Sequence, residues 1–393
     1  MTATAEETRI TPPETPLGHP VQGVVDVTDG HGYLRTSGYR RSPADIPLTP
    51  GQLRQHGLRK GDHIEGTAVP REQASGSRNS KNARDARDSR LTGVTAVNGL
   101  PPDEAKLRPH FENLTPVYPS ERLRLEAGDT SATARIIDLV SPIGKGQRGL
   151  IVAPPKAGKT MVLKTIAHAI AHAYPEVHLM LVLVGERPEE VTDLRRSVRG
   201  EVVFSTFDQS PDDHVRAAEL AIERAKRLAE LGQDVVVLLD SLTRLGRAYN
   251  LAAPASSRTL SGGVAASALQ PPRQFLGAAR NLEEGGSLTI LSTVLVDTGS
   301  QLDNVLFEEF KGTGNMELRL RRDLAEKRVF PAVDAAPSGT RRDDLLMDPA
   351  EHAAVVSLRR VLAALDPQHA TELLLDKTRQ PNAAFLGQVR ASR

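Results

Sequence analysis

Hydrophobic and polar residues alternate along the first part of the chain, in short runs that Gly, Asp and Pro separate. Within residues 21–98 the runs VQGVVDV, GYLRT, HIEGTAV and LTGVTAV each have the pattern of a half-exposed strand. Several short strands with turn residues between them predict a small all-β barrel, the OB-fold or cold-shock-like type among others.

A different pattern begins at about residue 140. Continuous apolar runs, which are typical of strands buried on both faces, alternate there with helical segments. The expected strands are RGLIVA, HLMLVLV, VVFSTF, VVVLLD and SLTILSTVLV, and the expected helices include MVLKTIAHAIAHA and HVRAAELAIERAKRLAEL. This alternation predicts a doubly wound α/β domain over residues 140–393, whose last part, from about Pro349, has a helical pattern.

Three further segments complete the predicted organisation. Residues 1–20 are rich in Thr, Pro and Glu and are expected to form a disordered tail, and residues 99–139 form a connector. Residues 71–90 interrupt the barrel with six basic and three acidic residues and no apolar side chain larger than alanine, so we expect a mobile basic loop. Such a loop either makes salt-sensitive contacts with phosphates or is only a solvated insertion.

Composition narrows the classes of function. The chain has no cysteine, which excludes disulfides, cysteine-ligated zinc and thiol chemistry and fits a reducing cytoplasm. No apolar run reaches the roughly 18 residues of a membrane-spanning helix, and the N-terminus lacks the charged-then-apolar order of a signal peptide. We therefore expect a cytoplasmic protein with no membrane partner. The net charge of +1 neither indicates nor excludes a nucleic-acid partner, because a local patch decides that.

The segment APPKAGKT, residues 153–160, is close to a phosphate-binding loop and lies between an expected strand and an expected helix. In that context Lys159 would reach the β- and γ-phosphates of a nucleotide, and Thr160 would ligate Mg²⁺. The usual pattern has glycine where this chain has Ala153, which matters only if the position needs a positive φ. The apolar run VVVLLD ends in Asp240, the position expected for a second acid that holds Mg²⁺.

Hydrolysis also needs a group that orients the attacking water. Glu186 follows the run HLMLVLV at the carboxyl edge of the expected sheet, and its position favours it over Glu189 and Glu190. Positive charge must oppose the charge that develops on the phosphate, and the segment SGTRRDD offers Arg341 and Arg342. An arginine that acts from a neighbouring subunit would imply a ring or a filament.

Long motifs along the chain resemble a known family. VSPIGKGQRGLIVAPPKAGKT, GERPEEVTDLRR, LLDSLTRLGRAYN, EEFKGTGNMELRL and SGTRR are similar to motifs of the Rho family of bacterial transcription termination factors, as is the order of a small barrel before an α/β core. The match covers about residues 21–346. It implies a RecA-like P-loop ATPase core and a homohexameric ring that hydrolyses ATP with Mg²⁺ between subunits. It also implies an RNA helicase or translocase that threads single-stranded RNA and releases transcripts from RNA polymerase, with elongation factors as further partners.

The resemblance also implies roles for single residues. Lys159, Glu186 and Arg341 match catalytic positions, with Arg341 acting from the neighbouring subunit, and Thr160 and Asp240 match the Mg²⁺ ligands. The matching ATP-binding residues are Gly144, Lys145, Gly146, Gln147, Arg148, Gly149, Lys156, Ala157, Gly158, Lys159, Thr160, Met161, Arg187 and Phe330. Arg244 and Arg247 fall in motifs that line or couple the ATP interface.

The RNA-binding residues implied by the resemblance form two groups. The barrel group is Gly30, His31, Gly32, Tyr33, Leu34 and Arg35, and the group on the inner face of the ring is Arg258, Thr259, Ser261, Gly262 and Lys311. His31 and Tyr33 would stack on bases, and Arg35 would offer a guanidinium. A loop around residues 298–301 belongs to the same inner face.

The chain departs from the family at several positions. Pro47 stands where a barrel aromatic is expected and DSRLTGV lacks an aromatic pair, which argues against a strict pyrimidine preference. Gly185 replaces a carboxylate before Glu186, and Gln301 replaces a pore-loop lysine. Three functions therefore remain open: an RNA-dependent translocase, a related RecA-type motor with another substrate, and an RNA-binding relative with impaired motor activity.

Overall fold

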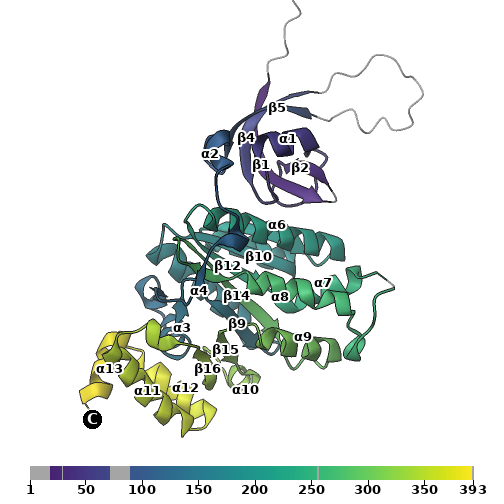
Figure 1. Cartoon of the computed structure of the whole chain (residues 1–393). Helices are drawn as coiled ribbons and strands as arrows, with labels where there is room; N and C mark the ends of the chain where they lie inside the picture. The colour runs from purple at the N-terminus through teal and green to yellow at the C-terminus, as the bar shows by residue number, and fades with distance from the viewer. Residues whose placement is uncertain (1–17, 29, 71–88, 255, 392–393) are drawn as a thin grey trace, which may run out of the picture. The chain divides into compact units, whose positions relative to one another are not determined.

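The computed structural model describes residues 18–28, 30–70, 89–254 and 256–391. Most of the predicted tail and of the predicted basic insertion lies outside these residues. The chain divides into two compact units. The barrel unit takes its described residues from 1–37, 41–59 and 63–106, and the core unit takes them from 38–40, 60–62 and 107–393 (Figure 1).

The barrel unit is built on a five-stranded antiparallel sheet in the order β3-β2-β1-β4-β5. Its strands are β1 (His19–Thr28), β2 (His31–Arg35), β3 (Ile46–Leu48), β4 (His63–Pro70) and β5 (Ser89–Val97). Alternation directs every second side chain inward, so Val25, Leu34 and Ile64 meet in one buried cluster. Two short helices, α1 (Pro50–His56) and α2 (Pro102–Ala105), complete the unit.

The core unit is built on a nine-stranded sheet whose main path runs β11-β10-β12-β14-β9-β15-β16. Its strands are β6 (Pro116–Val117), β9 (Arg148–Ala153), β10 (His178–Glu186), β11 (Glu201–Thr206), β12 (Asp234–Asp240), β13 (Arg280–Leu282), β14 (Ser287–Leu295), β15 (Met316–Leu320) and β16 (Val333–Thr340). Neighbours from β11 to β15 along this path are parallel, and β16 is antiparallel at the edge. The strands β7 (Arg122–Leu123) and β8 (Ile143–Gly144) form a separate pair.

Helices cover both faces of this sheet, because each face has its own buried hydrophobic cluster. One cluster includes residues of α3 (Ala132–Val140), α4 (Lys159–Ala173), α5 (Pro188–Ser197), α11 (Pro349–Ala363), α12 (Pro367–Lys377) and α13 (Asn382–Ala391). The other includes residues of α6 (Pro211–Ala229), α7 (Leu242–Ala252), α8 (Gln270–Gly277) and α9 (Gln301–Lys311). A short helix, α10 (Arg322–Glu326), follows β15.

The 3₁₀ helices are short connections between these elements. They are η1 (Phe111–Asn113), η2 (Leu125–Ala127), η3 (Ser261–Gly263), η4 (Ala266–Ala268) and η5 (Asp343–Leu345).

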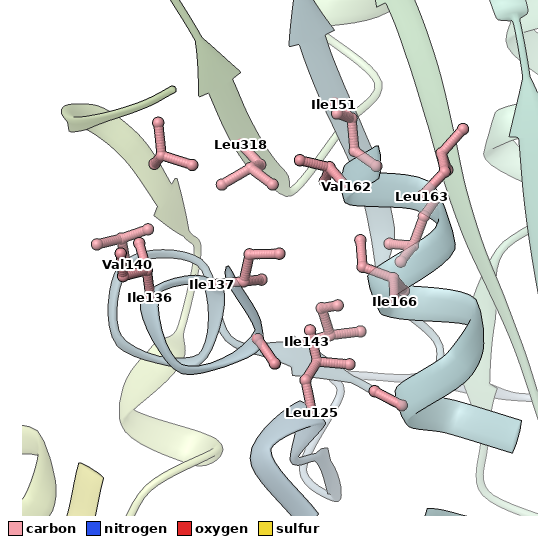
Figure 2. Packing of buried hydrophobic residues seen from close by; sticks show 14 of the residues in the cluster. Leu125, Ile136, Ile137, Val140, Ile143, Ile151, Val162, Leu163, Ile166 and Leu318 are labelled. Carbon is pink, nitrogen blue, oxygen red and sulfur yellow. The ribbon is translucent and has the colours of Figure 1, made fainter. Parts of the chain in front are cut away.

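Helix α3 belongs to the core and is not part of a simple linker. Figure 2 shows Ile136 and Ile137 of α3 in one cluster with Ile151 of β9 and Ile166 of α4, and all four side chains are fully buried. The connector predicted for residues 99–139 therefore contains most of a helix that packs against one face of the sheet. The reason is the apolar run Ile136–Ile137 within an otherwise mixed segment, which the helix turns toward the core.

The predicted fold class is confirmed: a doubly wound α/β core follows a small all-β barrel. Each apolar run predicted to be a strand is a strand, and the chain after Pro349 is helical. Within the described residues, every helix is too short or too polar to span a lipid bilayer.

Candidate functional site

The predicted phosphate loop joins the carboxyl end of β9 to the amino end of α4, the position in which a helix N-terminus can receive an anion. Lys156 and Gly158 of this loop have left-handed backbones, with φ of 66° and 93°. Ala153 has no positive φ; it ends β9 with its side chain fully buried. The position where the usual pattern has glycine therefore accepts alanine without backbone strain.

Lys159, the first residue of α4, lies between two buried carboxylates. Its Nζ is 3.3 Å from Glu186 Oε1 at the end of β10, and it also contacts Asp240 Oδ1 at the end of β12. These strands are parallel neighbours, with Leu183 beside Asp240, so their carboxyl ends meet at one edge of the sheet. The structure thus brings together three residues that the sequence places far apart. Thr293 of β14 donates a further hydrogen bond to Asp240 Oδ1 at 2.8 Å.

One lysine ammonium faces two carboxylates, so its positive charge balances only one of the two negative charges. Glu186 is only 3% exposed. Its burial and then the negative charge of Asp240 raise the pKa of Glu186 to about 7, although Lys159 and Arg244 act in the opposite direction. A carboxyl group with this pKa accepts and releases a proton near neutral pH, as a group that handles a water proton must.

Gly185 shapes the position of Glu186. The pairing of β10 with β11 shifts register between Val184 and Glu186, and Gly185 has a φ of 67° at that bulge. Arg244 of α7 donates to the Gly185 carbonyl, and its Nη2 is 3.5 Å from Glu186 Oε1. A Cβ on Gly185 would lie 3.3 Å from Arg244 Cδ. The glycine that departs from the family pattern therefore leaves room for Arg244 beside Glu186.

Other predicted ATP-binding residues surround the loop. Phe330 is 47% exposed, and two of its ring atoms lie 3.7 Å from the place where a Cβ on Gly158 would be. Lys156 and Met161 are exposed and Thr160 is half-buried, whereas Ala157 is buried beneath the loop. Arg187 is an exposed residue that directly precedes α5.

Arg341 and residues 144–149 lie elsewhere. Residues 144–149 lead into the start of β9, so they lie at the amino edge of the sheet, opposite the phosphate loop. Arg341 is at the same edge, because its N–H donates to the Asn315 carbonyl at 2.8 Å and Asn315 accepts from Arg148 N–H at 2.8 Å. The six residues of β9 span about 20 Å. Arg341 therefore does not reach Lys159 or Glu186 of its own chain.

Several side chains at this edge have structural partners. The Lys145 ammonium lies 2.7 Å from Asp234 Oδ2, and Gln147 donates to Asn315 Oδ1 at 2.6 Å. Among the described residues, the Arg148 guanidinium instead donates to two backbone carbonyls, those of Thr313 and Ala279. Burial, and then the charges of Arg280 and Arg341, lower the pKa of Arg148. Arg148, Arg280 and Arg341 therefore lie near one another at this edge.

The predicted inner-face residues are split between two places. Arg258, Thr259, Ser261 and Gly262 belong to the loop after α7, which packs on the start of α9; a Cβ on Gly262 would be 3.1 Å from the Gln301 carbonyl. Lys311 is exposed at the far end of α9, a helix of 11 residues, and is therefore about 15 Å away along its axis.

A buried aspartate, Asp303, connects these loops with helix α7 through hydrogen bonds. Asp303 is fully buried at the start of α9, and Arg247 of α7 forms two hydrogen bonds with it, at 2.8 and 2.5 Å. Thr298 donates to the same carboxylate at 2.6 Å. Helix α7 begins just after Asp240. It therefore connects the loop at residues 298–301 with the carboxyl edge of the sheet, where Lys159, Glu186 and Asp240 meet.

The barrel unit has one aromatic face. His31 and Tyr33 alternate on the exposed side of β2, and Tyr33 is 38% exposed. Pro47 of β3 is the residue directly opposite Tyr33. The structure corrects the expectation for Leu34: its side chain is fully buried in the barrel core, so it supports the strand and does not face a ligand.

Arg35 also differs from its expected role. It is only 4% exposed, and its guanidinium lies 2.5 Å from Asp26 and 2.5 Å from Asp45. Arg35 Cζ lies 5.2 Å from the Tyr33 ring centroid, so the arginine holds this ring in place. A hollow of about 490 Å³ beside it is lined by Tyr33, Arg35, Arg41, Ser42, Pro43 and Asp45. Asp45 Oδ1 is buried there without a hydrogen-bond partner among the described residues.

Comparisons with known proteins agree with both units. Residues 133–340 match the nucleotide-binding domain of the ATP synthase alpha/beta family, and residues 21–103 match the RNA-binding domain of Rho termination factor. A transcription termination factor Rho of Streptosporangium roseum is 57% identical over 94% of this chain and 92% of its own length. The chain belongs to the Rho family. The resemblance seen in the sequence is thereby confirmed.

Longer Rho proteins are similar as well. The Rho proteins of Streptomyces lividans and Micrococcus luteus are 60% and 57% identical, over 94% and 97% of this chain. The chain spans about half the length of these relatives, 52% and 55%. Among solved structures, an ATPase of the type III secretion system of pathogenic bacteria has a TM-score of 0.56 at 23% identity, over 70% of this chain and 81% of its own. That likeness supports the fold of the Rho core alone.

Sequence reasoning missed Thr293, Asp303 and Asp45. Thr293 could have been found, because it is a hydroxyl residue inside a run predicted to be buried on both faces. Asp303 and Asp45 gave no signal of this kind, since neither lies inside a continuous apolar run.

Proposed function

We propose that the protein is an RNA-dependent ATPase that moves along single-stranded RNA and terminates transcription by releasing transcripts from RNA polymerase in the cytoplasm. The observation that carries this proposal is Lys159 held between Glu186 and Asp240 at a phosphate loop, in a chain that also has a Rho RNA-binding domain. The alternative function, a related RecA-type motor that acts on another substrate, does not explain the exposed His31 and Tyr33 and is disfavoured for that reason.

ATP would bind with its phosphates on the loop and its adenine against Phe330. Lys159 leaves its two carboxylates to meet the β- and γ-phosphates, and Glu186 then accepts a hydrogen bond from the attacking water and orients it. Arg244 keeps Glu186 in place through the Gly185 carbonyl and its own contact with the carboxylate. Burial of Glu186 and Asp240 excludes competing water from the reacting group.

The residues present fit Mg²⁺. Asp240 already contacts one cation, the Lys159 ammonium, and Thr160 supplies a hydroxyl oxygen; both are the oxygen donors that Mg²⁺ prefers. We assign these two residues as its ligands. Mg²⁺ would neutralise charge on the phosphate oxygens.

Each ATP site would be completed by a second copy of the chain. Arg341 lies at the opposite edge of the sheet from Lys159, so it serves a nucleotide only on a neighbour. The same reasoning applies to Arg148, which lies at that edge as well. A closed set of such head-to-tail contacts is a ring, and the family resemblance supports a hexamer.

RNA would be captured on His31 and Tyr33 and then engaged by the loops after α7 and before α9. The bonds from Arg247 and Thr298 to Asp303 would pass movement between the nucleotide edge and those loops. Pro47 opposite Tyr33 removes a second stacking surface, which favours a relaxed base preference.

Transcript release tests this function directly. We expect the protein to release RNA from a stalled elongation complex only when hydrolysable ATP is present, and Lys159→Ala to abolish release. If the complex stays intact with ATP while the protein binds its RNA, the RNA-binding relative with impaired motor activity is the better account.

Replacing Tyr33 by alanine should weaken RNA binding. One stacked base is worth about 1–3 kcal/mol, so we expect the dissociation constant for a short single-stranded RNA to rise about 5- to 150-fold. Tyr118→Ala is the matched control, because Tyr118 is an exposed tyrosine of the core unit. Equal affinities of the Tyr33 variant and the control would remove Tyr33 from the RNA site. The measurement is fluorescence anisotropy.

The raised pKa of Glu186 predicts a dependence of stability on pH. The folded protein holds this proton up to about pH 7, whereas an ordinary glutamate loses it near 4.5. The resulting stabilisation is complete below about 4.5 and is lost as the pH rises through about 7. The melting temperature of Glu186→Gln minus that of the wild type should therefore increase over this window, without nucleotide, and stay level above it. A difference that does not change with pH would contradict the raised pKa.

A further inference from the structure

A cationic hollow lies on the core unit, apart from the site of Lys159, Glu186 and Asp240. It has a volume of about 460 Å³ and is lined by residues of the last turns of α4 and α5 and of the loop after α5. Its members are His168, Ala171, His172, Arg195, Arg196, Ser197, Val198 and Arg199. It is also distinct from the predicted inner-face loops, because α4 and α5 pack on one face of the sheet and α7 and α9 on the other.

The three arginines of this hollow are not neutralised within the described part of the chain. Arg195, Arg196 and Arg199 are exposed, and no described carboxylate lies within ion-pair distance of them. The nearest acid along α5, Asp193, is paired with Lys164. The C-terminus of a helix favours nearby cations, which accounts for Arg195 and Arg196 on α5 but not for Arg199 beyond it.

Two histidines stand on the other wall. The rings of His168 and His172 are stacked at 4.1 Å between centroids, tilted by 35°, and both side chains are exposed. His172 Nδ1 lies 3.1 Å from the His168 carbonyl, which fixes the second ring. Arg195 is steadied by the Phe204 ring, 5.7 Å from its Cζ. The hollow therefore combines exposed guanidinium groups with two imidazole rings.

We propose that this hollow is a further contact site for single-stranded RNA, additional to the barrel and the inner-face loops. Guanidinium groups match phosphate oxygens in a bidentate manner, and rings that face solvent offer stacking surfaces for bases. A free phosphate or an acidic peptide would use the arginines and leave the rings idle, whereas RNA uses both. The site rests on the proposed function only in taking RNA as the ligand.

The test is the triple variant R195Q/R196Q/R199Q in the full chain. Two RNAs separate this site from the barrel: one of about eight nucleotides, within the roughly 4–16 that one OB-fold covers, and one several times longer. We expect the short RNA to bind the variant as it binds the wild type. For the long RNA we expect an affinity about 100-fold lower at 0.1 M salt, with the slope of log affinity against log salt reduced by about 2, since each phosphate contact on a single strand contributes about 0.7.

The matched control is R360Q/R379Q/R390Q, which removes the same charge from exposed positions at the C-terminal end of the chain. The control should bind both RNAs as the wild type does, and equal melting temperatures would establish that both variants fold. An unchanged long-RNA affinity and slope in the first variant, or an equal loss in the control, would overturn the proposal. Failure of Tyr33→Ala to affect the short RNA would count against the barrel site alone.

Discussion

Glu186→Gln is expected to reduce ATP hydrolysis by about 10²–10⁴-fold while the protein still binds ATP. Glutamine keeps the shape of the side chain but cannot accept a proton from the attacking water. Lys159 remains in place to hold the phosphates, and Asp240 remains to hold Mg²⁺. The loss should therefore appear in kcat and not in the affinity for the nucleotide. Steady-state hydrolysis with saturating single-stranded RNA, together with equilibrium binding of a non-hydrolysable analogue, measures both quantities.

Glu189→Gln is the matched control for this experiment. Glu189 lies in the first turn of α5, three residues from Glu186, and is exposed. It should keep the activity of the wild type. Full activity of Glu186→Gln with loss in the Glu189 variant would move the water-orienting role to the helix and refute the assignment.

Arg341→Ala should have an effect of similar size for a different reason. An arginine that stabilises the transferred phosphate contributes about 10³–10⁵ in rate. Because Arg341 lies at the opposite edge of the sheet from Lys159, the loss should occur at the neighbour's site. Nucleotide affinity of the variant subunit's own phosphate loop should stay normal.

Mixing two inactive variants separates action on a neighbour from action within one chain. A subunit with Arg341→Ala still has Glu186, and a subunit with Glu186→Gln still has Arg341. At the contact where the first subunit's loop meets the second subunit's Arg341, a complete site forms, so a mixture should regain hydrolysis that neither variant has alone. A mixture as inactive as its parts would mean that Arg341 serves its own chain, against the geometry described above.

Much of the fold followed from hydrophobic pattern because parallel strands buried on both faces must be continuously apolar. The runs VVVLLD and SLTILSTVLV became β12 and β14 for that reason. The meeting of Lys159, Glu186 and Asp240 was also predictable. Glu186 and Asp240 end parallel strands, and Lys159 begins the helix that follows a third one. Helix α3 was not recognised, because its apolar face is short and lies in a segment with few other signals.

Positions set by pairing between distant segments could not be predicted. Arg35 had the pattern of a free guanidinium, but Asp26 across the hairpin and Asp45 beyond it enclose the side chain. The place of Arg341 depends on β16 running antiparallel to β15, which returns the chain to the amino edge. The bulge at Gly185 is likewise a property of the pairing of β10 with β11 and has no mark in the sequence beyond the glycine itself.

The central claim is that RNA binding drives ATP hydrolysis at a site built from Lys159, Glu186 and Asp240. The most direct test is the steady-state rate of ATP hydrolysis with and without single-stranded RNA, with poly-C and poly-U compared, for the wild type and Glu186→Gln. The account predicts strong stimulation by both polymers in the wild type and none in the variant. A wild-type protein that is folded and RNA-bound, yet whose hydrolysis neither polymer stimulates, would contradict it.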